Sequence, residues 1–284
     1  MATAQPPRTP LVYEPTETGL PLLRPYLRDL WARRNFMWHL ARTDLKAEHY
    51  DTALGQLWIV LDPLLMAAVY YLLRTVVRPA GSSGVGRNAL IAHVLWGVFF
   101  FTFTSNCLTA GARSVMVGKG LVLNASFPRA LLPLVAIIKA SVDFVPTFVV
   151  YLAFHAWLGQ PFTVALLVVP ILFALQTVFG LGLALLFAPL MVFYRDTGGF
   201  LPYLTRLWLY LTPVLYLVSE IPPNLRPVFL VNPLYPFFGA LGQIFVGAVP
   251  SPWYLLGAAA WAFVTFFVGA VLFLAREREF AVRL

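Results

Sequence analysis

The amino-acid sequence predicts an all-α integral membrane protein with six transmembrane helices, an N-terminal amphipathic interface helix and a re-entrant outer hairpin between the fifth and sixth spans. Composition is the first basis for this prediction, because the chain of 284 residues is 60% hydrophobic and only 11% charged. Soluble domains carry about 25% charged residues. The second basis is that apolar residues form runs reaching the roughly 20 helical residues that cross a bilayer core.

The predicted spans are 57–77, 90–112, 130–157, 162–193, 200–218 and 253–275. The fourth is longer than one perpendicular crossing requires, so we expect it to tilt, to kink near Pro170 or Pro189, or to project from the bilayer. Lys and Arg flank the spans, and most of them fall on the side that holds both chain termini. This bias predicts a multi-pass protein of the bacterial cytoplasmic (inner) membrane with both termini in the cytosol.

The chain divides into four predicted regions: a proline-rich, disordered cytosolic arm (1–21), amphipathic and cytosolic helices (22–56), a six-helix transmembrane domain (57–275) and a cytosolic tail (276–284). Between the fifth and sixth spans, residues 227–250 are apolar enough to cross but are broken by Asn232, Pro233 and Pro236. A full crossing would place the arginine-rich end outside, against the charge bias. We therefore expect a re-entrant hairpin, which requires its broken backbone to be buried in protein or to line a cavity.

Residues from Leu22 to about Leu40 show apolar side chains at helical spacing opposite a basic face. This pattern predicts an amphipathic helix in the cytosolic membrane interface, although packing on a protein partner fits it equally well. The candidate residues of this interface helix, for which the family resemblance stated below also implies a role in the gate, are Leu27, Trp31, Arg33, Arg34, Trp38 and Arg42.

The sequence argues against an enzyme. Gly118 and Lys119 stand together as in a phosphate-binding loop, but Arg113 and Gly120 occupy positions where that loop has Gly and Ser or Thr, so we expect no ATPase site. The acidic residues are too dispersed for a membrane glycosyltransferase. The histidines lack metal-ligand spacing, so no metal site is predicted. Scattered basic residues do not suggest nucleic-acid binding.

Lys139 and Asp143 form the sharpest intramembrane pair, because they are spaced i to i+4 on one face of the third span. Both charges would be costly in a bilayer unless paired. A neutralised structural pair that faces the bundle interior is favoured over a proton relay, since no further acidic chain accompanies it.

Aromatic residues make up 15% of the chain, more than two interfacial belts require. Some of them are candidates for lining a pathway, because aromatic faces offer apolar contact to sugars while Tyr and Trp tips offer hydrogen bonds. Belt or lipid-facing placement is the simpler interpretation of any single one. The candidates are Trp58, Tyr70, Tyr71, Tyr203, Trp208, Tyr210 and Tyr216.

Four motifs together resemble the permease subunits of ABC exporters for lipid-linked polysaccharides, of the O-antigen and teichoic acid type. They are TDLKAEHYDTALGQLWIVLDPLL (Thr43–Leu65), FPRALLP (Phe127–Pro133), FYRDTG (Phe193–Gly198) and LTPVLYLVSEIPPNLRPVFLVNPLYPFF (Leu211–Phe238). The resemblance covers nearly the whole chain after its first 20 residues. Thr52 and Thr212 depart from an expected Ser, and Asp62 from an expected Asn.

The resemblance implies a homodimer in the membrane, joined to two copies of a separate P-loop ATPase that binds ATP and Mg, with no cofactor in this chain. The cargo would be a glycan on a polyprenyl diphosphate, and the hairpin would form an outer gate. The polar turn between the second and third spans would couple the ATPase to the bundle, although these residues could instead only set topology. The coupling candidates are Lys119, Asn124, Phe127, Pro128 and Arg129.

Three alternatives remain open from the sequence. A permease of the same fold could export a drug or a lipid. A membrane glycosyltransferase or an ion-coupled carrier is less favoured, for the reasons given above. The excess of arginine over lysine suggests a GC-rich bacterial genome and a cell-wall galactan as one possible glycan.

Overall fold

The computed structural model describes residues 22–48, 54–77, 86–222 and 224–284. The predicted disordered arm and Thr52 therefore lie outside the described residues. Within the described part the chain is all-helical and contains no strand. The α-helices are α1 (Leu23–Ala32), α2 (Arg34–Glu48), α3 (Trp58–Val77), α4 (Arg87–Val117), α5 (Lys119–Asn124), α6 (Leu131–Trp157), α7 (Val169–Phe193), α8 (Thr197–Leu211), α9 (Arg226–Leu230), α10 (Tyr235–Phe245), α11 (Pro252–Arg276) and α12 (Phe280–Arg283). Short 3₁₀ turns are η1 (Gly55–Leu57), η2 (Val164–Val168), η3 (Val218–Glu220) and η4 (Glu277–Glu279).

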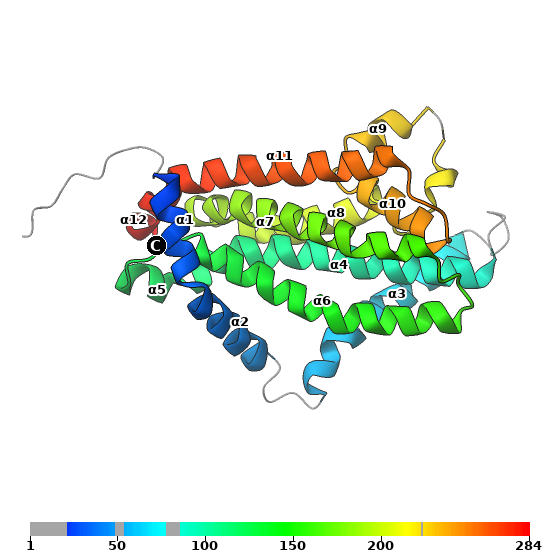
Figure 1. Cartoon of the computed structure of the whole chain (residues 1–284), viewed down its shortest axis with the longest axis horizontal. Coiled ribbons are helices and arrows are strands. Elements are labelled where there is room, and N and C mark those ends of the chain that lie inside the picture. The colour runs from blue at the N-terminus through cyan, green and yellow to red at the C-terminus, as the bar shows by residue number, and fades with distance from the viewer. Residues whose placement is uncertain (1–21, 49–53, 78–85, 223) are drawn as a thin grey trace, which may run out of the picture.

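Five helical stretches in the described part are long and apolar enough to cross a membrane. They are Gly55–Val76, Arg87–Asn124, Leu131–Trp157, Val164–Phe193 and Pro252–Arg283. They correspond to five of the six predicted spans. Figure 1 shows these helices running roughly side by side along the long axis of the molecule.

The predicted fourth span is divided at its start. The 3₁₀ turn η2 precedes α7, and Pro170 occupies the first turn of α7, where its missing N–H costs no helical hydrogen bond. Pro189 lies inside α7. The long apolar run is thus a 3₁₀ turn followed by a helix of 25 residues, which is about 37 Å long.

The predicted fifth span corresponds to α8, which has only 15 residues and is about 22 Å long. It ends at Leu211 because Thr212 precedes Pro213, and a residue before proline is forced out of the helical region. Thr212 accordingly has φ −97° and ψ 142°. Among the described residues there is therefore no sixth helix long enough to cross by itself.

The backbone after α8 is nevertheless buried in protein. Thr212 and Val214 are both fully buried. A Cβ atom built on Gly97 of α4 would lie 3.2 Å from Val214 Cγ1, so glycine allows this turn to approach α4 closely. Irregular backbone at membrane depth is tolerated where it is covered in this way.

The core of the bundle is formed by α4, α7 and α11, and the most extensive contacts of α7 are with α11 and α4. Small residues let their backbones come close. A Cβ atom on Gly182 of α7 would lie 2.5 Å from the backbone nitrogen of Phe266 in α11. On the α4 side, a Cβ atom on Gly180 would lie 2.8 Å from Cys107 Sγ. Glycine at these positions sets the distances between the three helices.

The stretch 227–250 is broken as its Asn and Pro residues predict, because α9 and α10 are separate short helices joined through Asn232 and Pro233. Most of α10 is buried, and it packs against α11, α7 and α4. Its backbone thus meets the burial requirement of a re-entrant segment.

The N-terminal region forms two helices where the sequence suggested one. The break falls at Arg33, which has φ −93° and ψ 12°. Helix α1 has no buried residue, whereas α2 packs on α6 through Met37, Ala41 and Val135. Leu30 of α1 packs against this cluster, whereas Leu27 and Trp31 stay exposed.

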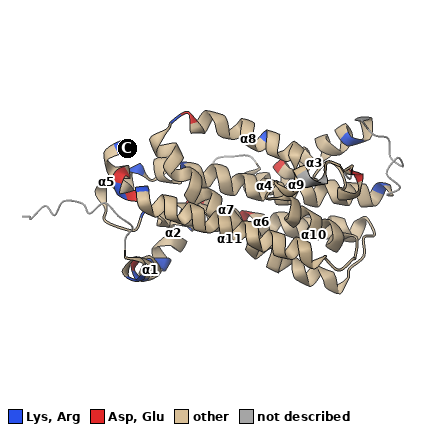
Figure 2. Cartoon of the chain, turned by 90° about the horizontal axis from the view of Figure 1, so that it is seen from above, with Lys and Arg blue, Asp and Glu red and all other residues tan. Residues whose placement is uncertain are grey.

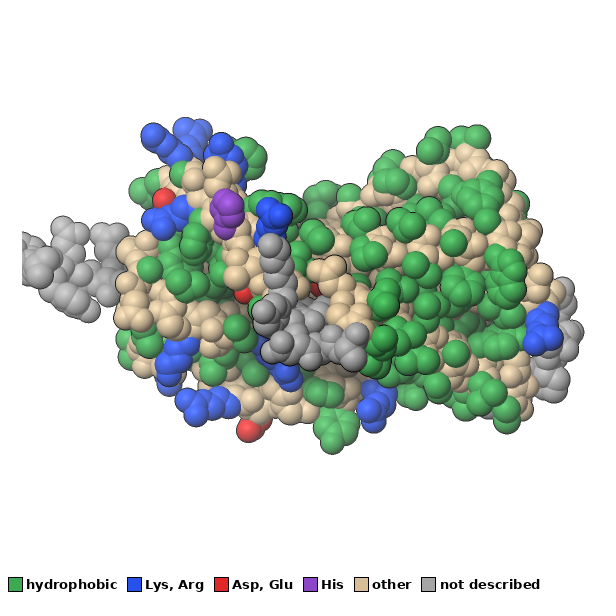
Figure 3. Space-filling view, turned by 90° about the horizontal axis from the view of Figure 1, so that it is seen from below, with side chains coloured by type: hydrophobic (Ala, Val, Ile, Leu, Met, Phe, Trp, Pro, Cys, Tyr) green, Lys and Arg blue, Asp and Glu red, His purple; other side chains and the backbone are tan. Residues whose placement is uncertain are grey.

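The two ends of the bundle differ. The end called here the α5 end carries α1, α5 and α12, and the opposite α10 end carries α9 and α10 (Figure 1). Lys and Arg lie mainly toward the two ends of the molecule in Figure 2. The space-filling view in Figure 3 shows a broad hydrophobic surface between them. This distribution is typical of a membrane protein.

Candidate functional site

The polar turn between α4 and α6 lies at the α5 end. Lys119 and Asn124 are exposed at the two ends of α5, and Asn124 donates a hydrogen bond to the carbonyl oxygen of Gly120 at 2.8 Å. Pro128 is buried, and Phe127 is half-buried against two apolar clusters of the chain itself. Phe127 therefore contributes to this protein's own packing as well as to the surface of the turn.

The sequence analysis missed the contribution of residues 277–284 to this turn. Lys119 Nζ donates to the carbonyl oxygen of Leu284. Arg129 Nη1 donates to the carbonyl oxygen of Glu277. The one available signal was Phe280, an aromatic residue in an otherwise charged sequence, and its side chain is fully buried.

Tyr26 of α1 completes this arrangement. Its hydroxyl donates to Glu277 Oε2 at 2.7 Å and accepts a hydrogen bond from the backbone N–H of Ala130 at 3.3 Å. The pKa of the Tyr26 hydroxyl lies well above its ordinary value. Burial is the main cause, and the neighbouring Glu277 carboxylate is the second. The hydroxyl therefore remains a hydrogen-bond donor at physiological pH. We call the group formed by Tyr26, Arg129, Ala130 and Glu277 the Glu277 clasp.

A cavity of about 580 Å³ lies beside the Glu277 clasp, between α1, the turn after α5 and η4. Asp29 of α1 and Arg33, at the break between α1 and α2, line one wall and are joined by an ion pair of 3.3 Å. Phe127 and Pro128 line another wall. Coupling and interface candidates from distant parts of the sequence thus meet at one cavity.

The remaining interface candidates lie on exposed surfaces. Leu27 and Trp31 are 58% and 70% exposed. The guanidinium group of Arg34 stacks over the Trp31 ring with a distance of 5.4 Å to its centroid. Trp38 and Arg42 are exposed on α2. An uncovered apolar face beside arginines is what a membrane interface or a partner protein would bind.

The aromatic pathway candidates divide into two groups. Tyr203 and Tyr210 are exposed on α8, at 70% and 49%. Tyr70 of α3 lies near Tyr210 and Arg206 of α8. Tyr71 is half-buried and accepts a hydrogen bond of 3.2 Å from Arg87 Nε. We call the surface formed by Tyr70, Tyr71, Tyr203, Arg206 and Tyr210 the α3–α8 face.

Trp208 and Tyr216 belong instead to the junction between α8 and α9. Trp208 Nε1 donates to Asn232 Oδ1 at 2.8 Å, and Asn232 Nδ2 donates to the carbonyl oxygen of Leu211 at 2.9 Å and to Thr212 Oγ1 at 3.2 Å. Tyr216 stacks edge-on against Phe229 at 5.9 Å. The threonine that departs from the family pattern is therefore a buried structural residue.

An ion pair joins α3 to the same region at the α10 end. Arg74 Nη2 lies 2.5 Å from Glu220 Oε1, and the two side chains are only 7% and 10% exposed. Glu220 Oε2 also accepts the backbone N–H of Leu217 at 3.0 Å. The sequence analysis assigned no ion pair to Arg74.

The intramembrane pair candidates Lys139 and Asp143 are both half-buried on α6. Asp143 lines a cavity of about 250 Å³ between α3, α4 and α6, together with Asp62 and Trp58 of α3. Thr147 donates to the carbonyl oxygens of Ile59 and Asp143, each at 3.3 Å. The mutual pairing of Lys139 with Asp143 stays a prediction.

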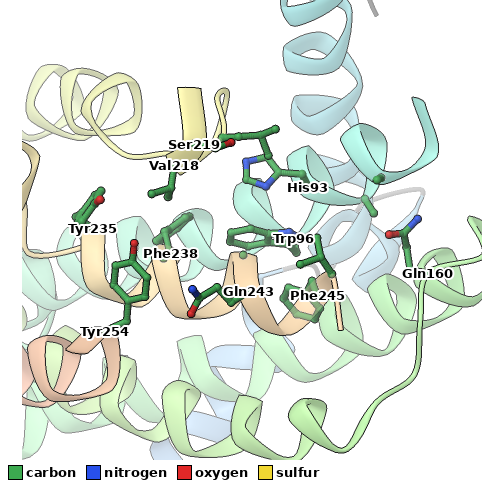
Figure 4. A pocket seen from close by; sticks show the side chains of 16 residues that line it. His93, Trp96, Gln160, Val218, Ser219, Tyr235, Phe238, Gln243, Phe245 and Tyr254 are labelled. Carbon is green, nitrogen blue, oxygen red and sulfur yellow. The ribbon is translucent and has the colours of Figure 1, made fainter. Parts of the chain in front are cut away.

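A third cavity, of about 480 Å³, opens at the α10 end between α4, η3, α10 and α11. Figure 4 shows His93 and Trp96 of α4 close together, with Phe238 and Gln243 of α10 and Tyr254 of α11 lining the cavity beside them. Among the described residues that line it, none is charged. Such walls suit an uncharged ligand or water, because these lining residues offer hydrogen bonds but no cation to pair with a phosphate group.

No group of three or more His, Cys, Asp or Glu side chains in the described ranges is arranged to hold a metal ion. His93 Nε2 contacts the carbonyl oxygen of Tyr216 at 3.2 Å. His155 Nδ1 contacts the hydroxyl of Tyr151 at 3.0 Å. His93 and His155 thus each have a local partner.

Comparison with known proteins identifies relatives that match this chain along most of its length. It is 28% identical over 258 residues to the O-antigen export system permease protein RfbA of Myxococcus xanthus, covering 90% of this chain and 97% of that protein. It is 26% identical over 243 residues to a protein of the same name from Klebsiella pneumoniae, covering 85% of this chain and 92% of that protein. The ABC-2 type transporter family matches residues 37–246, which contain α3 to α10. The chain therefore belongs to the ABC-2 type transporter family and resembles its O-antigen export permeases.

Proposed function

We propose that this chain is the permease subunit of an ABC exporter that moves a polyprenyl-diphosphate-linked polysaccharide across the cytoplasmic membrane. In this proposal two copies form the membrane pore, and ATP hydrolysis takes place on two copies of a separate P-loop ATPase. The support comes from the family match and from relatives whose names describe O-antigen export. A cell-wall galactan is one candidate for the polymer.

The topology we propose has six crossings and cytosolic termini. Helix α8 would cross together with the buried turn that follows it, and α9 and α10 would form a re-entrant hairpin on the outer side. The basic residues around α1, α5 and α12 would place the α5 end in the cytosol. Arg74 and Arg87 would then lie at the outer end.

The observation that carries the transport proposal is a row of exposed residues on α8. Tyr203, Arg206 and Tyr210 are exposed and spaced by three and four residues, so they share one side of the helix. An arginine in the middle of such a segment is costly against lipid. A second copy of the chain, or a hydrated path between two copies, would cover it favourably.

The α3–α8 face also suits a glycan. Exposed tyrosine rings provide apolar surfaces for sugar rings, and their hydroxyls provide hydrogen bonds. Helix α3 is the least buried of the five long helical stretches. A second copy packed across this face would bring two sets of tyrosines to a shared path.

Energy would enter from the α5 end. A separate ATPase can act on the bundle only through its cytosolic elements, and the turn after α5 combines the apolar Phe127 with the basic Lys119 and Arg129. Apolar anchors with charged neighbours are typical of protein interfaces. Helix α1 would lie in the cytosolic membrane interface beside this docking surface.

The experiment that tests the function is depletion of the protein in its native bacterium, followed by analysis of lipid-linked polymers. We expect a polyprenyl-linked polysaccharide to accumulate inside the cell and to leave it when wild-type protein is restored. The double variant Tyr203→Ala/Tyr210→Ala should restore export poorly. Phe267→Ala is the matched control, because Phe267 of α11 is 70% exposed, as is Tyr203, but is not part of the α3–α8 face.

A different outcome would overturn the proposal. If depletion left all lipid-linked polymers unchanged and caused a small drug or a free lipid to accumulate, the protein would be an exporter of that compound. If the two tyrosine replacements restored export as well as Phe267→Ala, the α3–α8 face would not be the path.

A further inference from the structure

Residues 277–284 fold back onto the bundle at the α5 end. Phe280 is fully buried and contacts the rings of Phe193 at 6.4 Å and Phe273 at 5.3 Å between centroids. These aromatic residues belong to an apolar cluster that also includes Val122 of α5 and Val192 of α7. The segment is therefore anchored between α5, α7 and α11.

Glu277 lies where α11 gives way to this segment and is 6% exposed. Its carboxylate accepts a hydrogen bond from the hydroxyl of Tyr26, which is 251 positions earlier in the chain. Its carbonyl oxygen accepts a hydrogen bond from Arg129 Nη1, 148 positions earlier. One residue thus contacts both α1 and the turn that follows α5.

Ala130 provides a further contact of the Glu277 clasp. The Tyr26 hydroxyl, which donates to Glu277, accepts the backbone N–H of Ala130 just before α6. A hydrogen bond to a carboxylate is stronger than one between neutral groups. Removal of one partner from a buried hydrogen bond leaves the other unsatisfied, which makes the arrangement resist separation.

Beyond the Glu277 clasp, α11 is closely packed on α7 through Gly182. A displacement of α1 or of the α5–α6 turn would therefore reach the two central helices directly. Rigid elements joined by buried contacts are the physical means by which movement at one site changes another.

We propose that Glu277 is a positioning residue for energy coupling: it joins α1 and the α5–α6 turn to α11, so that an ATPase partner moves these elements and the bundle as one body. This inference rests on the proposed function. Residues 277–284, rather than forming a free cytosolic tail, are then a working part of the coupling apparatus.

The test uses the full permease with its ATPase partner in lipid vesicles. Three quantities are measured for each variant: ATPase bound, ATP hydrolysed and lipid-linked glycan exported. Tyr26→Phe and Glu277→Ala each remove the hydroxyl–carboxylate hydrogen bond. We expect both to retain ATPase binding and hydrolysis but to lose roughly tenfold in glycan exported per ATP, a size typical of coupling between sites.

Two further variants separate coupling from folding. Glu277→Gln keeps an oxygen that can accept the Tyr26 hydroxyl and keeps the backbone carbonyl for Arg129, so it should retain most of the export per ATP. Glu279→Ala is the matched control, because Glu279 is two positions away in an exposed ion pair with Arg276 at 3.2 Å. Loss of that pair should leave the export per ATP unchanged.

The inference is wrong if Tyr26→Phe and Glu277→Ala lower only the yield of folded complex while assembled complexes export normally per ATP. It is also wrong if Glu277→Gln is as impaired as Glu277→Ala, since the hydrogen bond would then not be the cause. If the wild-type complex itself exports no glycan, the proposed function fails independently of the Glu277 clasp.

Discussion

The buried ion pair between Arg74 and Glu220 provides the most quantitative prediction of the fold. The two side chains are 7% and 10% exposed, and their charged atoms lie 2.5 Å apart. Arg74→Met would take away the cation that is paired with the buried Glu220 carboxylate, which should lower the free energy of unfolding by about 3–5 kcal/mol. Glu220→Met also removes the acceptor for the Leu217 N–H, so its loss should be larger by about 1 kcal/mol.

The double variant distinguishes a buried charge pair from a packing effect. Arg74→Met/Glu220→Met removes both charges of this pair and fills their place with apolar side chains, so it should recover much of the loss. The exposed pair of Arg276 and Glu279, at 56% and 44% exposure, is the control. Its disruption should cost no more than about 1 kcal/mol.

The assay is equilibrium unfolding of purified protein in detergent micelles, arranged as a double-mutant cycle. A favourable coupling energy of several kcal/mol is expected. If Arg74→Met alone were as stable as the wild type, or if the two losses simply added in the double variant, the ion pair would not join α3 to η3.

Three further predictions concern other parts of the bundle. Gly182→Leu should prevent the close approach of α7 and α11 and reduce the yield of folded protein severely. Gly120→Leu is the control and should fold, because Gly120 has open space around it. Similar yields of the two variants would contradict the packing account. Asn232→Ala removes the hydrogen-bond partner of Trp208, Leu211 and Thr212. It should lower the free energy of unfolding by about 1–3 kcal/mol. An unchanged free energy of unfolding would show that the α8–α9 junction does not depend on these hydrogen bonds. Replacing Lys139 or Asp143 alone with an apolar residue should destabilise the bundle, and replacing both should restore stability; a stable double variant that no longer transports would favour a proton relay.

The long apolar helices could be predicted well because length and hydropathy determine them. The predicted span 253–275 corresponds to α11, Pro252–Arg276, and the predicted 130–157 corresponds to α6, Leu131–Trp157. Proline chemistry explains the shortened α8, and Pro213 was a signal that the sequence analysis did not use. By contrast, no Gly or Pro stands next to Arg33 to indicate the break between α1 and α2.

The candidate site was only partly accessible from sequence. The polar turn after α5 was found because charged residues interrupt apolar sequence. The Glu277 clasp was missed because its partners are as much as 251 positions apart, and periodicity does not report contacts over such separations. The charged residues around Glu277 also predict a solvent-exposed segment, although Glu277 itself is buried by Tyr26 and its neighbours.

The central claim is that this permease exports a lipid-linked polysaccharide with energy from a separate ATPase. The most direct measurement is reconstitution of the purified permease, with and without that ATPase, in vesicles loaded on the ATPase side with a polyprenyl-diphosphate-linked glycan. We predict that the glycan reaches the opposite side only when the permease, the ATPase and ATP are all present, and that the permease alone hydrolyses no ATP. Glycan crossing without the ATPase, or ATP hydrolysis by the permease alone, would contradict the account.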